Sequence, residues 1–130
     1  MGGAAAFAVL ATLNAGGYRY GASDQAFYIP AVLHQLDPAL FPRDWAMLGA
    51  QARFFFVDEI FAGLVRLSGL PLAAWFALAQ FATLAVFYAG ALALGRQVLT
   101  SPWAVTAWIA ALTLRHRIAK TGANTLEGYF

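Results

Sequence analysis

Uncharged, mainly apolar residues fill three long stretches of the chain and predict three membrane-spanning helices. The stretches are residues 3–17, 72–94 and 98–114. At about 1.5 Å per residue, the middle one is roughly 35 Å long, enough to cross a hydrocarbon core of about 30 Å. The first is shorter and marginal. A signal peptide is its alternative interpretation, although the basic residues that open a signal peptide are missing.

The second and third stretches are predicted to form a helical hairpin. Residues 95–97, Gly-Arg-Gln, are expected to make a tight turn between them. Gln80 and Thr83 are expected to form hydrogen bonds with neighbouring helices at membrane depth. Small residues recur along one face of the second stretch and predict a surface for close helix packing: Ala82, Ala85, Ala89 and Ala93.

Charges and prolines gather in the long loop 18–71 between the first two spans. Its first part shows helical periodicity, with an apolar stripe at Ile29, Val32, Leu33 and Leu36. Pro30 leaves two alternatives, since the helix either kinks there or begins there. The chain is expected to turn at Asp37-Pro38 and to re-enter a helix near residues 43–45.

Residues 53–68 have the pattern of an amphipathic helix. One face carries apolar side chains, namely Phe54, Val57, Phe61, Leu64 and Val65. Asp58 and Glu59 are expected on the solvated face, and with Arg66 they argue against a full span. A helix lying in the membrane interface fits this pattern best.

Composition supports a membrane protein, because 62% of the 130 residues are hydrophobic and only 11% are charged. A typical soluble domain has about 25% charged residues. The net charge of +2 gives no basis for binding nucleic acid, and the absence of cysteine excludes disulfides and thiolate metal sites. We therefore expect an all-α membrane protein, with about three transmembrane helices plus amphipathic interfacial helices in the first long loop. Residues 1–130 are expected to be the N-terminal part of a single multi-pass membrane domain that continues with further spans.

Two short motifs in the loop resemble a known group of enzymes. Asp24-Gln25-Ala-Phe-Tyr28, with the later Arg43-Asp44-Trp45, resembles the first extracytoplasmic loop of GT-C-type glycosyltransferases. Those multi-pass enzymes transfer sugars from polyprenyl-phosphate donors. The chain is more similar to an uncharacterised bacterial family of multi-pass membrane proteins. That likeness lies in Tyr20-Gly-Ala-Ser-Asp-Gln, Tyr28-Ile-Pro, Leu36-Asp-Pro and the ending Glu127-Gly-Tyr-Phe.

The resemblance implies roles for particular residues. Asp24 would be the catalytic base or a metal-associated carboxylate, and Asp44 a second acid of the same site. Gln25 replaces the Glu that is usual in the motif, which puts a divalent metal cofactor in doubt. The lipid phosphate of a polyprenyl-phosphate sugar would be bound by side chains of Tyr28, Arg43, Arg115 and Arg117. The lipid bilayer would be the other partner, and the bacterial inner membrane the expected location.

The same residues also have ordinary structural interpretations. Asp24 follows Ser23, a helix-capping residue, and Asp44 either pairs with Arg43 or caps a short helix. His34 is expected to be packed and hydrogen-bonded rather than a ligand. The alternative function is a non-enzymatic membrane module, either a transporter part or an assembly or scaffold subunit. An enzyme would require Asp24 and Asp44 to face one cavity.

Overall fold

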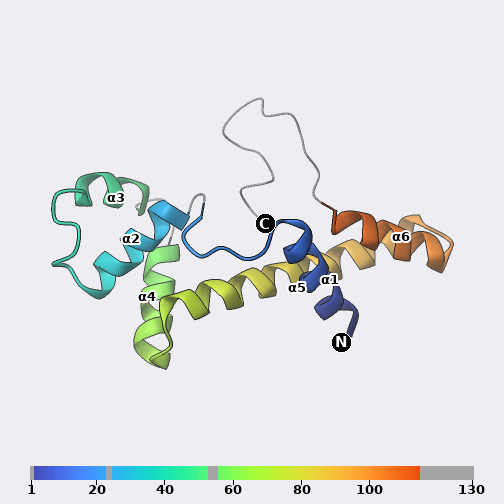
Figure 1. Cartoon of the computed structure of the whole chain (residues 1–130), viewed down its shortest axis with the longest axis horizontal. Coiled ribbons are helices and arrows are strands. Elements are labelled where there is room, and N and C mark those ends of the chain that lie inside the picture. Colours follow the sequence, from blue (N-terminus) through green and yellow to red (C-terminus); the bar gives the residue numbers. More distant parts are fainter. Residues whose placement is uncertain (1, 23–24, 53–55, 115–130) are drawn as a thin grey trace. The chain divides into compact units, whose positions relative to one another are not determined.

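The computed structural model describes residues 2–22, 25–52 and 56–114. In these ranges the chain is helical and contains no strand, which confirms the all-α prediction. The helices are α1 (Gly2–Asn14), α2 (Gln25–Leu36), α3 (Trp45–Ala52), α4 (Val57–Ser68), α5 (Leu72–Val98) and α6 (Pro102–Leu112) (Figure 1).

The chain divides into two compact units. One comprises Met1–Tyr18 and Leu78–Phe130, and we call it the bundle unit. The other, Arg19–Ala77, is the loop unit. The loop unit holds α2, α3, α4 and the first turns of α5.

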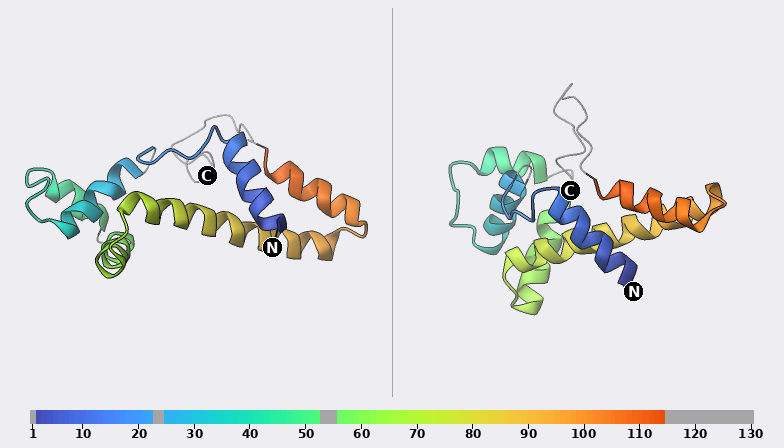
Figure 2. Two further views of the ribbon diagram at one scale, coloured as in Figure 1. Left: turned by 60° about the horizontal axis from the view of Figure 1, so that its bottom comes forward. Right: turned by 45° about the vertical axis from the view of Figure 1, so that its right-hand side comes forward.

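Apolar side chains hold the bundle unit together. Phe7 and Ala8 of α1 pack with Leu84 of α5 in its buried core. The Phe7 ring lies 5.6 Å from the Tyr88 ring, centroid to centroid. Ile109 and Leu112 of α6 are packed against the same cluster. Figure 2 shows α1 and α6 beside the second half of α5.

The packing face of α5 differs from the predicted one. Buried or half-buried residues recur every three or four positions at Leu84, Tyr88, Ala91 and Gly95. The predicted alanine face is instead largely open, with Ala82, Ala89 and Ala93 exposed and Ala85 half-buried. Large apolar side chains of α1 and α6 cover the observed face. The fit between these side chains, rather than a row of small residues alone, therefore determines which face of α5 is packed.

The predicted turn at residues 95–97 is wrong, because α5 continues to Val98. The Leu99 N–H donates to the Gly95 carbonyl at 2.8 Å, so helical hydrogen bonding persists past Arg96. A single glycine costs a helix only about 1 kcal/mol, and Gly95 is buried beside Trp108. The break comes at Ser101, which is extended (φ −97°, ψ 130°) because Pro102 follows it and opens α6.

One helix of the described part, α5, is long and apolar enough to cross a membrane. It has 27 residues, so it is about 40 Å long. Only 6% of its most apolar 18-residue segment is buried within the chain. The spans predicted at 3–17 and 98–114 are apolar helices, but α1 has 13 residues and α6 has 11. Both are shorter than a perpendicular crossing requires.

A hydrogen-bonded corner joins α4 to α5. Gly69 ends α4 in the left-handed conformation (φ 69°), which costs glycine little. The Ser68 hydroxyl donates to the Leu64 carbonyl at 2.6 Å and accepts from the Leu70 N–H at 3.1 Å and the Trp75 indole N–H at 2.9 Å. Nearby, the Phe61 and Phe76 rings stack with centroids 4.6 Å apart. These contacts fix the direction in which α4 meets the first turns of α5.

Candidate functional site

Of the residues that the resemblance assigns to a site, Asp24, Arg115 and Arg117 lie outside the described ranges. Their roles stay predictions. Tyr28, Arg43 and Asp44 all lie in the loop unit.

Asp44 occupies the N-cap position of α3. Its backbone carbonyl accepts hydrogen bonds from the N–H groups of Met47 and Leu48, both at 3.0 Å. Its own N–H donates to the Phe41 carbonyl at 3.1 Å. A carboxylate at this position favours the positive end of the helix dipole, so the position is compatible with the capping alternative. The side chain is also exposed and open to a ligand.

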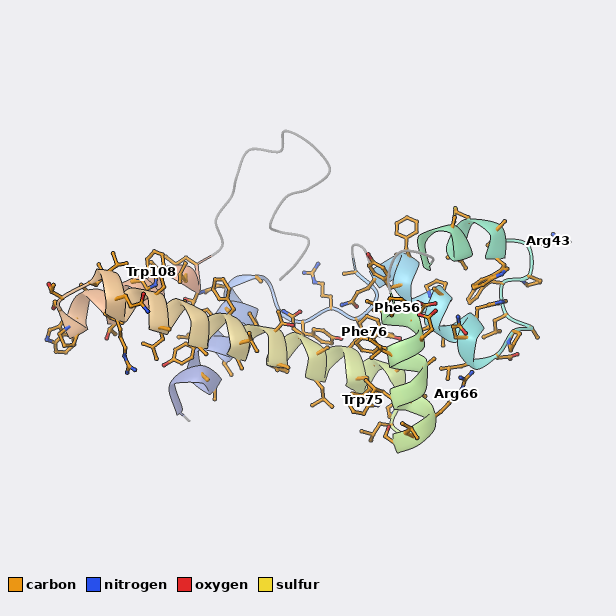
Figure 3. All side chains as sticks on the ribbon, turned by 180° about the vertical axis from the view of Figure 1, so that it is seen from behind. Arg43, Phe56, Arg66, Trp75, Phe76 and Trp108 are labelled. Carbon is orange, nitrogen blue, oxygen red and sulfur yellow. The ribbon has the colours of Figure 1, made fainter. Side chains whose placement is uncertain are left out.

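Arg43 is the exposed cation beside this carboxylate. Figure 3 shows it in the segment that leads into α3. Among the described residues, no ion pair joins Arg43 to Asp44, so the pairing that the sequence allowed is not formed there. Tyr28 lies half-buried on α2, and no hydrogen bond links it to either residue in the described part. Arg43 and Asp44 are thus neighbours in sequence without an ion pair between them in the described part, and no hydrogen bond there joins Tyr28 to them.

Gln25, the departure from the enzyme motif, has a local structural task. Its side-chain carbonyl accepts a hydrogen bond from the Gly21 N–H at 2.9 Å, and Gly21 has a positive φ of 82°. The Gln25 N–H donates to the Ala22 carbonyl at 3.2 Å. These two bonds close the turn that leads into α2, which begins at Gln25 and runs through Pro30. Of the two alternatives for Pro30, the structure therefore excludes a helix start there.

His34 connects the end of α2 to the start of α3. Its ring stacks on the Trp45 indole at 4.0 Å with an interplanar angle of 20°. Its Nδ1 lies 2.7 Å from the Leu40 carbonyl, which can only accept, so Nδ1 carries the proton. This confirms the packed, hydrogen-bonded histidine. The turn between the helices is also as predicted, because the Asp37 carboxylate accepts from the Ala39 N–H at 3.0 Å.

A buried carboxylate, Asp58 of α4, is the main residue that sequence reasoning misplaced. It is only 3% exposed, whereas its neighbour Glu59 is exposed. The expected solvated position of Asp58 is therefore wrong. The reason is that α2 packs along this side of α4, where Ala62, one turn later, is 1% exposed. A pattern of Asp58, Ala62 and Val65 at i, i+4 and i+7 was the signal available in the sequence.

Gln35 partners this buried acid. Its side-chain N–H donates to Asp58 Oδ2 at 3.3 Å, and its backbone carbonyl accepts a hydrogen bond from the Arg66 guanidinium. Both bonds join α2 to α4. A buried carboxylate needs hydrogen bonds to offset its desolvation, and Asp58 has this single side-chain donor among the described residues. The Asp58–Gln35–Arg66 cluster is thus a polar connection within an otherwise apolar contact.

The remaining electrostatic features are modest. Partial burial raises the pKa of Tyr20, whose ring lies edge-on to Phe76 with centroids 5.8 Å apart. Within the ranges that the structure describes, no three His, Cys, Asp or Glu side chains gather closely enough to hold a metal ion. The described part of the loop unit therefore offers an exposed Arg–Asp pair and a buried carboxylate.

Comparison of the sequence with protein-family models, and of the chain with curated proteins and solved structures, found no match.

Proposed function

We propose that the chain is an integral membrane module in which α5 and the helices packed on it, α1 and α6, lie within the bilayer. The observation that carries this proposal is the apolar, uncovered surface of α5. Its exposed side chains include large apolar ones, namely Phe81 (42% exposed), Val86 (74%) and Leu94 (53%). Water would solvate such a surface poorly, whereas lipid tails or further apolar helices would cover it well.

The packing of α1 and α6 on α5 supports a multi-pass arrangement. Both helices are apolar and contribute to the cluster around Phe7 and Leu84, so they would enter the bilayer with α5. The Asn14 amide at the end of α1 donates to the Thr113 carbonyl at 3.0 Å and its hydroxyl at 3.3 Å, just past α6. Side-chain hydrogen bonds of this kind join helices inside membranes. The short helices would then cross only part of the bilayer.

Cysteine accessibility tests this arrangement directly, because the chain has no native cysteine. Val86→Cys on α5 and Ala46→Cys on α3 are both exposed positions of a helix. The protein is reconstituted into vesicles whose bilayers are intact but whose inner and outer faces are both exposed to the reagent. A water-soluble maleimide should label Ala46→Cys readily. Val86→Cys should react only after detergent is added. Equal labelling of both positions in intact bilayers would refute the membrane proposal.

A glycosyltransferase of the GT-C type is the second candidate. It is favoured by the exposed neighbours Arg43 and Asp44, a cation and a carboxylate of the loop unit. A guanidinium there suits the phosphate of a polyprenyl-phosphate sugar, and a carboxylate suits activation of an acceptor hydroxyl. The position of Asp44 just before α3, where a carboxylate favours a helix N-terminus, supports the non-enzymatic alternative, a scaffold or assembly subunit, equally well.

Turnover separates these two candidates. The purified membrane protein is tested with a panel of polyprenyl-phosphate sugars, comparing wild type with Asp24→Asn, Asp44→Asn and Arg43→Ala. Glu59→Gln is the matched control, an exposed acid of the same unit outside the motif. The enzyme proposal expects turnover that Asp24→Asn and Asp44→Asn abolish while Glu59→Gln preserves it. Turnover that is unchanged in both Asp variants, or absent throughout the panel, favours the scaffold.

A further inference from the structure

Three large apolar side chains form an exposed stripe along α4. They are Phe56 (78% exposed), Ile60 (56%) and Leu67 (89%). At about 100° per residue they fall within an arc of roughly 40° on the helix surface, with Gly63 between them. The buried pair Asp58 and Ala62 lies on nearly the opposite side, facing α2. The helix therefore has one face used within the loop unit and another that nothing in the described chain covers.

Charged residues mark one border of this stripe. Glu59 and Arg66 are seven residues apart, so they share a flank of α4, and both are exposed. The Arg66 guanidinium donates to the Gln35 carbonyl, so its position is set by α2 (Figure 3). An apolar stripe bordered by charged side chains is the arrangement of helices that lie in the plane of a membrane surface.

The stripe ends a few residues before the membrane-spanning candidate begins. Leu67 is followed by Leu70, which is 43% exposed, and α5 begins two residues later at Leu72. The Ser68 corner holds the Trp75 indole against the end of α4, so the two helices cannot turn freely about this joint. The end of the stripe and the start of α5 therefore lie close together.

We propose that the Phe56–Ile60–Leu67 stripe inserts into the interfacial layer of the bilayer, so that α4 lies along the membrane and sets the loop unit on its surface. This inference rests on the proposed membrane location of α5. The short connection favours lipid over a separate protein partner, because α4 ends at Ser68 and the helix proposed to enter the bilayer begins at Leu72. Glu59 and Arg66 reach the headgroup layer from the border of the stripe.

Depth measurements test the proposal on the whole chain. An environment-sensitive fluorophore is attached to Ile60→Cys, Leu67→Cys, Glu59→Cys or Val86→Cys, and each protein is reconstituted into vesicles. Two quenchers are compared, aqueous iodide and a lipid with a nitroxide near its headgroup. We expect the lipid quencher to act on positions 60 and 67 at least threefold more strongly than iodide. Glu59→Cys, the matched neighbour on the charged border, should be reached by iodide more readily than either.

The outcomes separate this inference from the membrane proposal. If Val86→Cys is shielded from iodide while positions 60 and 67 are as accessible as position 59, the interfacial insertion is wrong and the membrane location stands. If Val86→Cys is itself open to iodide, the membrane location fails. Shielding of positions 60 and 67 from both quenchers would show that protein covers the stripe and would also overturn the inference.

Discussion

Removal of the Asp58 carboxylate tests whether the buried polar connection holds α2 against α4. Asp58→Ala leaves the Gln35 side-chain amide, which donates to Oδ2 at 3.3 Å, without its acceptor. A hydrogen bond to a charged group contributes about 1.5–3 kcal/mol, and a buried donor left unpaired costs about 1–3 kcal/mol. Relief of the carboxylate's own desolvation offsets part of this loss.

The length of the Gln35–Asp58 hydrogen bond determines how much free energy Asp58→Ala is expected to cost. At 3.3 Å it is longer than the usual separation of about 2.9–3.0 Å, so the lower part of the range applies. We expect Asp58→Ala to lower the free energy of separating α2 from α4 by about 1–2 kcal/mol. Asp58→Asn keeps an acceptor oxygen of nearly the same shape, so it should lose less than half of that amount.

Cysteine labelling measures this local opening. Val32 of α2 is 0% exposed, and Val32→Cys is slightly smaller than the native side chain, so it fits the site. A maleimide reaches this thiol only when the helices separate. A loss of 1–2 kcal/mol raises the labelling rate by about 5- to 30-fold when reclosing is faster than reaction.

The adjacent acid provides the control. Glu59→Ala removes an exposed carboxylate from the same turn of α4 and should change the labelling rate less than about twofold. Labelling in Asp58→Ala that matches wild type, or a larger effect in Glu59→Ala, would refute the structural role of Asp58.

Three further predictions concern the bundle unit and the start of the loop unit. Asn14→Leu removes both hydrogen bonds to Thr113 and should destabilise the protein in detergent by about 0.5–1.5 kcal/mol in thermal unfolding, with the exposed neighbour Leu13→Ala as control. Gly95→Val should cost about 1–3 kcal/mol by the same assay, because a Cβ there lies 3.1 Å from Trp108 Cδ1, whereas Gly90→Val meets open space and should cost less. Since partial burial raises the pKa of Tyr20 above its usual 10.0, the folded state holds the proton more tightly, and stability should fall as pH rises above 10. Tyr20→Phe, followed by alkaline titration of unfolding, should lose less stability in that range.

Much of the fold follows from local pattern. The uncharged run starting at Leu72 and the turn at Asp37-Pro38 lie where hydrophobicity and turn chemistry place them. The errors concern which side of a helix meets which neighbour. Gly95 continued a helix because Trp108 packs beside it, and that contact is not visible in local sequence. The residues of the enzyme-like motif lie partly outside the described ranges, so their grouping stays a prediction.

The two faces of α4 explain why Asp58 was misplaced. Sequence periodicity identifies a helix with an apolar side and a polar side, and it assigns water to the polar one. In the structure the acid at position 58 faces α2, and the large apolar groups at 56, 60 and 67 are the uncovered ones. This arrangement is unfavourable in water, because it exposes apolar surface while it desolvates a carboxylate. It becomes reasonable if the exposed apolar side chains lie in lipid and the Asp58 carboxylate is hydrogen-bonded by Gln35. The placement of Asp58 and the proposed membrane contact of α4 are therefore two consequences of one arrangement.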